Sequence, residues 1–102
     1  MPSVKPSVVW SPRAAADVQR LYRFLRDKNP VAAKRAIQAI RGGVHILTLQ
    51  ARMGRTVEGL PEVFREWPID FGHTGYLVRY RVDAAAITIL AVWHQKEVTG
   101  EE

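Results

Sequence analysis

Four side chains in the second half of this chain could do chemistry together: Arg65, Arg79, Arg81 and His94. Imidazole takes up a proton near neutral pH, and guanidinium groups stabilise the negative charge that develops on a reacting phosphate. This set could therefore cleave RNA, with the histidine as the base that activates a 2′-hydroxyl. The same cations could instead bind phosphates or acidic side chains without breaking a bond. A lone histidine at a strand end is also more often structural, so both interpretations stay open.

The composition gives no signal for metal or cofactor chemistry. The chain has 102 residues and no cysteine, so it offers neither a thiolate metal site nor a disulfide. We expect no cofactor, no metal and a reducing, cytoplasmic setting. No apolar run approaches the ~18 residues that span a membrane, and the opening residues lack the apolar core of a signal peptide. The length predicts a single domain over residues 1–102.

The charges are divided unequally along the chain. Residues 1–55 carry a net charge of +9 and residues 56–102 a net charge of −4, within a total of +5. Such an asymmetry predicts a basic surface that meets a nucleic acid or an acidic polypeptide. It is equally compatible with arginines that only solvate helix faces.

Two helices are predicted in the basic half. Ser11-Pro12 and Asn29-Pro30 each place a capping residue before a proline, which is a helix-start signal. Apolar residues follow at helical spacing and predict helices from about 12 to 27 and from 30 to about 49. The second continues in phase through Gly42-Gly43. Because only a short link joins them, the two form a helical hairpin.

The second half is predicted to be a sheet. Residues 50–61 carry two glycines and a proline without periodicity and predict a loop, and Pro68 is expected to end the strand before it. The order β-α-α-β-β-β predicts an α+β fold, with the helical hairpin packed on one face of a small, mainly antiparallel sheet. Runs of β-branched and aromatic residues predict the strands: 5–10, 63–67, 76–82 and 86–94.

Alternation along these strands predicts the two faces of the sheet. The apolar side of the last two strands should face the helices. The other side should carry Arg79, Arg81 and His94, joined by Arg65 and Trp67 from the strand 63–67. This open face is the candidate functional surface. The residues expected to be buried are Ile37, Ile40, Val44, Tyr80, Ile89 and Trp93.

The ordered set of motifs resembles the RelE/ParE toxin superfamily. The opening WSPRAAADVQRLYRFL carries an aromatic residue, Ser-Pro and an acidic residue on the first helix, as in that superfamily. The resemblance continues through Gly54-Arg55, FRE at 64–66, YLVRYRV at 76–82 and ITILAVWH at 87–94. It implies a small bacterial toxin of a type II toxin–antitoxin module, neutralised by a cognate antitoxin protein.

The superfamily divides by target, and the resemblance implies two alternatives. RelE-like members are ribosome-dependent mRNA endonucleases, whereas ParE-like members poison DNA gyrase and break no bond. Here Trp67 stands where nucleases often carry a second basic residue, Leu77 stands where nucleases of the GYR type carry arginine, and no tyrosine follows Tyr80. The sequence therefore favours a gyrase poison that is not an enzyme. The alternative is a RelE-type nuclease that uses Arg65, Arg79, Arg81 and His94, and a third hypothesis is a small nucleic-acid binder.

The gyrase hypothesis assigns surfaces to two partners. The partner implied by the resemblance is a ParD-like antitoxin, whose C-terminal segment wraps over the toxin, with assembly as a homodimer or a toxin–antitoxin hetero-oligomer. Acidic residues in that segment would complement the helix arginines and lysine: Arg20, Arg23, Arg26, Lys34 and Arg35. The gyrase contact, with DNA reached through gyrase, is assigned to a cluster at the sheet: Arg65, Arg79, Arg81, Trp93, His94 and Lys96.

Overall fold

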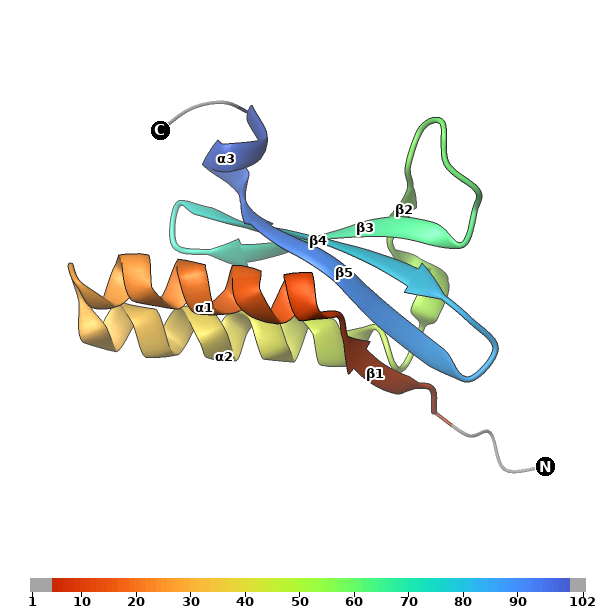
Figure 1. Cartoon of the computed structure of the whole chain (residues 1–102), viewed down its shortest axis with the longest axis horizontal. Helices are drawn as coiled ribbons and strands as arrows, with labels where there is room; N and C mark the ends of the chain where they lie inside the picture. The colour runs from red at the N-terminus through yellow and green to blue at the C-terminus, as the bar shows by residue number, and fades with distance from the viewer. Residues whose placement is uncertain (1–4, 100–102) are drawn as a thin grey trace.

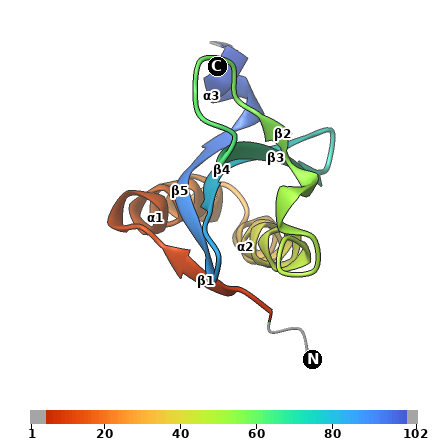
Figure 2. The ribbon, with the colours of Figure 1, turned by 90° about the vertical axis from the view of Figure 1, so that its right-hand side faces the viewer.

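The computed structural model describes residues 5–99 and confirms the α+β fold, with a helical hairpin against a five-stranded sheet (Figure 1). A short third helix follows the last strand and lies on the side of the sheet away from the hairpin (Figure 2). The elements are β1 (Ser7–Trp10), α1 (Pro12–Arg26), α2 (Pro30–Ile46), a 3₁₀ turn (Ala51–Met53), β2 (Arg55–Thr56), β3 (Phe64–Phe71), β4 (Thr74–Val82), β5 (Ala86–His94) and α3 (Gln95–Thr99).

Local capping fixes the starts of both long helices. The Ser11 hydroxyl accepts the N–H of Ala14 at 3.0 Å, and the Asn29 side chain accepts the N–H of Ala32 at 3.1 Å. A proline follows each cap at the first helical position, where its missing N–H costs no hydrogen bond. The predicted starts are thus confirmed, and α2 runs unbroken through its two glycines.

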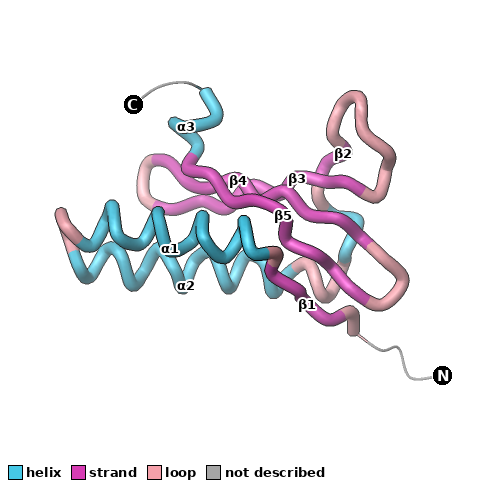
Figure 3. Tube along the Cα trace, viewed as in Figure 1, coloured by secondary structure: helices cyan, strands magenta, loops and turns pink. Residues whose placement is uncertain are grey.

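The strand order is β1-β5-β4-β3-β2, with β1 parallel to β5 and the other pairs antiparallel (Figure 3). Two sequence predictions are corrected here. The expected loop 50–61 contains β2, which pairs with Arg65 and Glu66. In addition, β3 does not end at Pro68 but continues to Phe71. Because β2 stops short of Pro68, this residue lies at the sheet edge, where a missing N–H breaks no ladder.

The core lies between the hairpin and the inner face of the sheet. Ile40, Val44, Tyr80 and Ile89 are fully buried there, as predicted. Ile37 is only half-buried, because it lines a groove between the two helices instead of facing the sheet. None of the helices within residues 5–99 is long and apolar enough to cross a membrane.

A β-bulge interrupts the pairing of β4 with β5. Arg79 lies opposite Ala91, but the next residue, Tyr80, lies opposite Ile89, so Leu90 is the extra residue. Because side chains alternate with a period of two, one extra residue exchanges the faces for the rest of the strand. The prediction that Trp93 is buried on the helix side is therefore wrong, and Trp93 is half-buried.

Candidate functional site

The register of β3 places two predicted surface residues on the helix side. Arg65 lies opposite Tyr80 and Trp67 opposite Val78, and both partners are core residues. Directly opposed residues in an antiparallel pair share a face. The expectation that Arg65 and Trp67 join Arg79 on the open face is therefore wrong. Trp67 packs against the hydrophobic core instead.

Arg65 holds the loop before β2. Its Nη1 donates to the carbonyl oxygens of Arg52 at 3.0 Å and Gly54 at 2.9 Å. The Tyr80 hydroxyl binds the same loop, donating to the carbonyl of Ala51 at 2.7 Å and accepting the N–H of Gly54 at 2.9 Å. Burial raises the pKa of Tyr80 above its ordinary value of 10.0, although the Gly54 hydrogen bond and the Arg65 charge oppose that rise. Tyr80 thus stays a neutral donor, and Arg65 has a structural task.

The open face carries Arg79 and Arg81, as predicted, and the bulge adds Trp93 to them. The guanidinium of Arg79 lies 5.3 Å from the centre of the Trp93 ring, and that of Arg13, from the start of α1, lies 5.4 Å from it. Both distances are those of cation–π contacts. Arg81 is held locally by an ion pair with Asp83 in the β4–β5 turn, at 3.3 Å.

Sequence reasoning missed the carboxylate at the centre of this face. Glu66 lies opposite Arg79 across the β3–β4 pair, and its Oε2 accepts from Nη2 of Arg79 at 2.6 Å and from Nε at 3.1 Å. Arg55 lies 3.5 Å from the other carboxylate oxygen. The signal was present in FRE, because Glu66 must face away from its neighbours Arg65 and Trp67, but the register was needed to place it.

His94 lies on the Tyr76 side and not among the open-face arginines, because of the same bulge. Its Nδ1 accepts the backbone N–H of Lys96 at 3.1 Å, which requires the proton on Nε2, and Nε2 lies 3.0 Å from the hydroxyl of Thr74. The Glu97 carboxylate accepts the N–H of His94 at 2.9 Å. Together these bonds form a reciprocal cap that starts α3. Both ring nitrogens are used in this structural role.

Arg20, a predicted antitoxin contact, is engaged within the chain. Its guanidinium forms an ion pair with Glu97 on α3 at 2.7 Å and lies 3.6 Å from Asp17. Asp17 in turn accepts the N–H of Val92 at 3.0 Å, just beyond Ile89, the last residue of β5 that pairs with β1. The link therefore joins α1 to the end of β5 and to α3.

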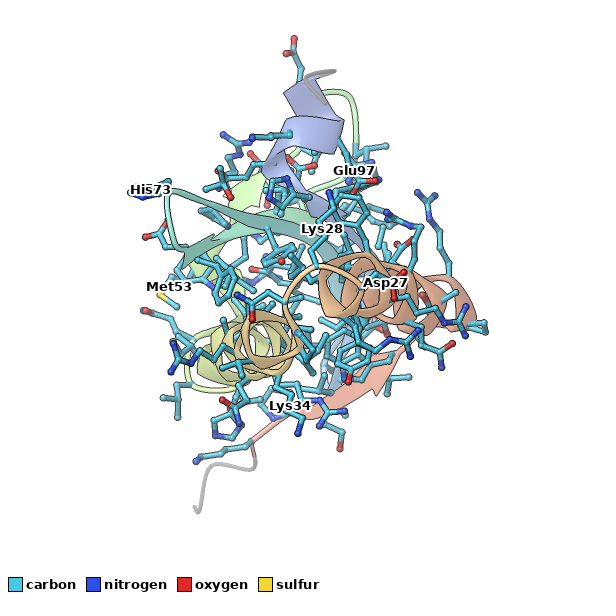
Figure 4. All side chains as sticks on the ribbon, turned by 90° about the vertical axis from the view of Figure 1, so that its left-hand side faces the viewer. Asp27, Lys28, Lys34, Met53, His73 and Glu97 are labelled. Atoms are coloured by element: carbon cyan, nitrogen blue, oxygen red, sulfur yellow. The ribbon has the colours of Figure 1, made fainter. Side chains whose placement is uncertain are left out.

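Three other predicted antitoxin contacts, Arg23, Arg26 and Lys34, line a groove between α1 and α2. The groove has a volume of about 550 Å³. Lys34, on its rim, and Glu97, on α3, lie on opposite sides of the hairpin (Figure 4). Arg35 is exposed on α2 but does not line the groove. The lining is an apolar floor with basic and amide side chains around it: Val18, Gln19, Tyr22, Arg23, Arg26, Lys34, Ile37, Gln38 and Arg41.

Within residues 5–99, no three histidine, aspartate or glutamate side chains gather in a way that could hold a metal ion. The arginines of the open face, Arg79 and Arg81, and Arg13 beside them each lie near a carboxylate. The face therefore carries cations held near carboxylates, and two of these cations, Arg13 and Arg79, contact the Trp93 ring. Such an arrangement is suited to binding an anionic partner.

The fold is that of a type II toxin–antitoxin toxin of the ParE/RelE kind. The structure is similar to a chain of the solved chromosomal ParDE system from P. aeruginosa, with a TM-score of 0.72 and 25% sequence identity over 90% of this chain and 98% of that one. The family model described as the ParE toxin of the type II toxin–antitoxin system parDE matches residues 8–99. The chain therefore belongs to the ParE toxin family.

Two curated relatives carry the other name of the superfamily. Toxin RelE3 of Caulobacter vibrioides is 35% identical over 91 residues, which cover 89% of this chain and 96% of that protein. Toxin RelE1 of the same organism is 32% identical over 91 residues, covering 89% of this chain and 95% of that protein. The resemblance predicted from the sequence motifs is confirmed, and the ParDE neighbour supports an antitoxin partner.

Proposed function

We propose that this toxin inhibits DNA gyrase by binding and does not cleave RNA. The observation that carries the proposal is the dispersal of the four residues that a nuclease would need. Arg65 and His94 lie on the helix side and hold a loop and a helix start, whereas Arg79 and Arg81 lie on the opposite face. Groups separated by a sheet cannot converge on one phosphate, as a base and its charge-stabilising cations must.

The proposed gyrase contact is the open face. Arg79, Arg81, Trp93 and Lys96 remain from the set predicted from the sequence, and Arg13 is added because it contacts the Trp93 ring. Arg65 and His94 contribute by supporting the loop and α3. Positioned guanidinium groups beside an aromatic ring suit acidic gyrase side chains or the phosphates of gyrase-bound DNA.

A His94→Gln variant is expected to keep most of the gyrase inhibition. Glutamine can preserve part of the hydrogen bonding but cannot exchange a proton near neutral pH. The measurement incubates the purified toxin with gyrase and supercoiled plasmid, and separately with translating ribosomes. If His94 were a general base instead, the His94→Gln variant would cleave messenger RNA about 10²-fold or more slowly than the wild type.

The control for this experiment is the denaturation midpoint of His94→Gln, which separates a loss of α3 capping from a loss of target binding. Codon-dependent message cleavage by the wild-type protein, with gyrase left untouched, would contradict the gyrase proposal and favour the nuclease.

We propose further that the groove between α1 and α2 receives a segment of the antitoxin. The apolar floor suits a segment that folds on binding, and the basic rim suits its acidic residues. Arg23, Arg26 and Lys34 are retained as contacts, whereas Arg20 is assigned to the link with Glu97 and Arg35 to the exposed side of α2.

Charge reversal in this groove should slow association with the antitoxin. Arg23→Glu is expected to lower the association rate constant by about 3- to 10-fold at low salt, with the difference shrinking as salt is added. The matched control is Arg35→Glu, which makes the same change in net charge outside the groove. Stopped-flow or surface-based kinetics measure both variants. Equal slowing by the two would show that only the overall charge matters and that the groove is not the contact.

A further inference from the structure

Among the side chains of residues 5–99, Glu66 is a buried carboxylate that the proposed function leaves without a task. It is 9% exposed and lies on the face of the sheet opposite the helices. A carboxylate loses much of its hydration at such a site and is tolerated when it is paired. The pairing is directed at one residue, because a single oxygen of Glu66 accepts from both Nε and Nη2 of Arg79.

This pairing fixes the direction of the Arg79 guanidinium. Two of its nitrogens face the Glu66 carboxylate, and the group lies 5.3 Å from the centre of the Trp93 ring. The Arg79 side chain is still 34% exposed, so part of it faces solvent. Because Arg79 is held through two of its nitrogens and through its planar face, it loses little further conformational entropy when it binds an anion.

Arg55 does not share this arrangement. Its nearest guanidinium nitrogen lies 3.5 Å from the second oxygen of Glu66, and its side chain is 71% exposed. An exposed ion pair at that distance contributes little orientation to either partner. The ordering effect of Glu66 is therefore confined to Arg79.

We infer that Glu66 is a positioning residue that holds Arg79 against Trp93, so that the two present one preorganised contact to the target. The inference rests on the proposed gyrase contact, which it deepens. Glu66 itself does not need to touch the target. Its carboxylate acts through Arg79, and the determinant of binding is the fixed Arg79–Trp93 pair and not the number of cations on the face.

The position of Arg79 is tested without any target. In the wild-type protein, NMR should show the Nε–H of Arg79 exchanging slowly with solvent. Glu66→Gln removes the charge at nearly constant shape and should speed that exchange by about tenfold or more. Arg55→Gln is the matched control, since it removes the other cation beside Glu66, and it should leave the exchange rate of Arg79 unchanged.

The consequence for binding is tested with gyrase and supercoiled plasmid. Glu66→Gln is expected to raise the toxin concentration for half-inhibition by about tenfold, and Arg55→Gln by less than about twofold. The double variant Glu66→Gln/Arg79→Gln should be no weaker than Arg79→Gln alone, because the carboxylate acts through that arginine. Arg79→Lys keeps the charge but not the planar fork, so it should lose as much inhibition as Arg79→Gln.

If the Nε–H of Arg79 still exchanges slowly in Glu66→Gln, the inference is wrong, but the proposed inhibition of gyrase is not affected by that result. Full inhibition by a Glu66→Gln protein whose Arg79 exchanges rapidly, or additive losses in the double variant, would overturn the inference as well. If Glu66→Gln does not fold, full inhibition by Arg79→Lys has the same meaning. A wild-type protein that leaves gyrase untouched contradicts the proposed function instead, and the exchange rates alone then decide whether Glu66 holds Arg79.

Discussion

Replacing Ile89 by alanine is expected to lower the free energy of unfolding by about 2–5 kcal/mol. Ile89 is fully buried on β5, where its neighbours are Trp10 on β1 and Tyr80 on β4. Deleting its side chain leaves a cavity between two paired strands and the helices, and the sheet cannot close that cavity without losing its pairing. Equilibrium denaturation in urea measures the loss.

The control for this substitution lies one residue away. Thr88 is only half-buried, and it lies opposite Arg81 on the face of the sheet away from the helices. Thr88→Ala is therefore expected to cost less than about 1 kcal/mol. A loss below that value for Ile89→Ala as well would show that β5 does not pack against the hairpin in solution.

Gly54→Ala is expected to cost about 2–4 kcal/mol, even though it adds only one methyl group. A Cβ at this position would overlap the Tyr80 hydroxyl and would lie 2.7 Å from the carbonyl oxygen of Glu66. Neither neighbour can move easily, because one is a fully buried ring and the other is strand backbone. The substitution therefore breaks the Tyr80 hydrogen bonds that hold the loop before β2.

The matched control is another glycine with open space around it. Nothing lies within 4 Å of a Cβ built on Gly42, which is inside α2. Gly42→Ala should stabilise the protein by about 0.5–1 kcal/mol, because alanine favours the helix. Thermal or chemical denaturation compares the two variants. A Gly54→Ala protein as stable as the wild type would show that Tyr80 does not hold this loop.

The arginines of α1 divide between the two proposed partner surfaces according to their helical position. Arg23 and Arg26 line the groove with α2, whereas Arg13 contacts Trp93 and Arg20 forms an ion pair with Glu97. Residues seven apart lie on nearly the same side of a helix, which explains why Arg13 reaches β5 and Arg20 reaches the adjoining α3. One helix can therefore serve the antitoxin contact along one side and support the target contact along the other.

Local signals in the sequence determined the helices, the main strands and the family. Ser11 and Asn29 cap their helices through side-chain bonds to nearby N–H groups, so a few consecutive residues are enough to predict both starts. The strand order along the chain follows from alternation and short links, and the ordered motifs carried the resemblance to the toxin superfamily that the comparisons confirm.

Tertiary structure decided which side chains share a face. Alternation relates residues within one strand, but the register between two strands depends on the turn that joins them. The turn between β3 and β4 is Gly72-His73, with Gly72 at a φ of +62°. The pairing that extends from this turn places Arg65 opposite the core residue Tyr80, on the helix side, and Glu66 opposite Arg79.

The bulge at Leu90 had the same effect on β5, where it exchanged the places of Trp93 and His94. No residue type marks the bulge in the sequence. The structure accommodates it where β1 ends, with the Leu90 carbonyl accepting the Ser11 hydroxyl at 3.2 Å and the Val92 N–H bound by Asp17. These partners lie 79 and 75 residues away along the chain, so only the folded chain brings them together. Because the side-chain period in a strand is two, a single extra residue reverses every face assignment beyond it.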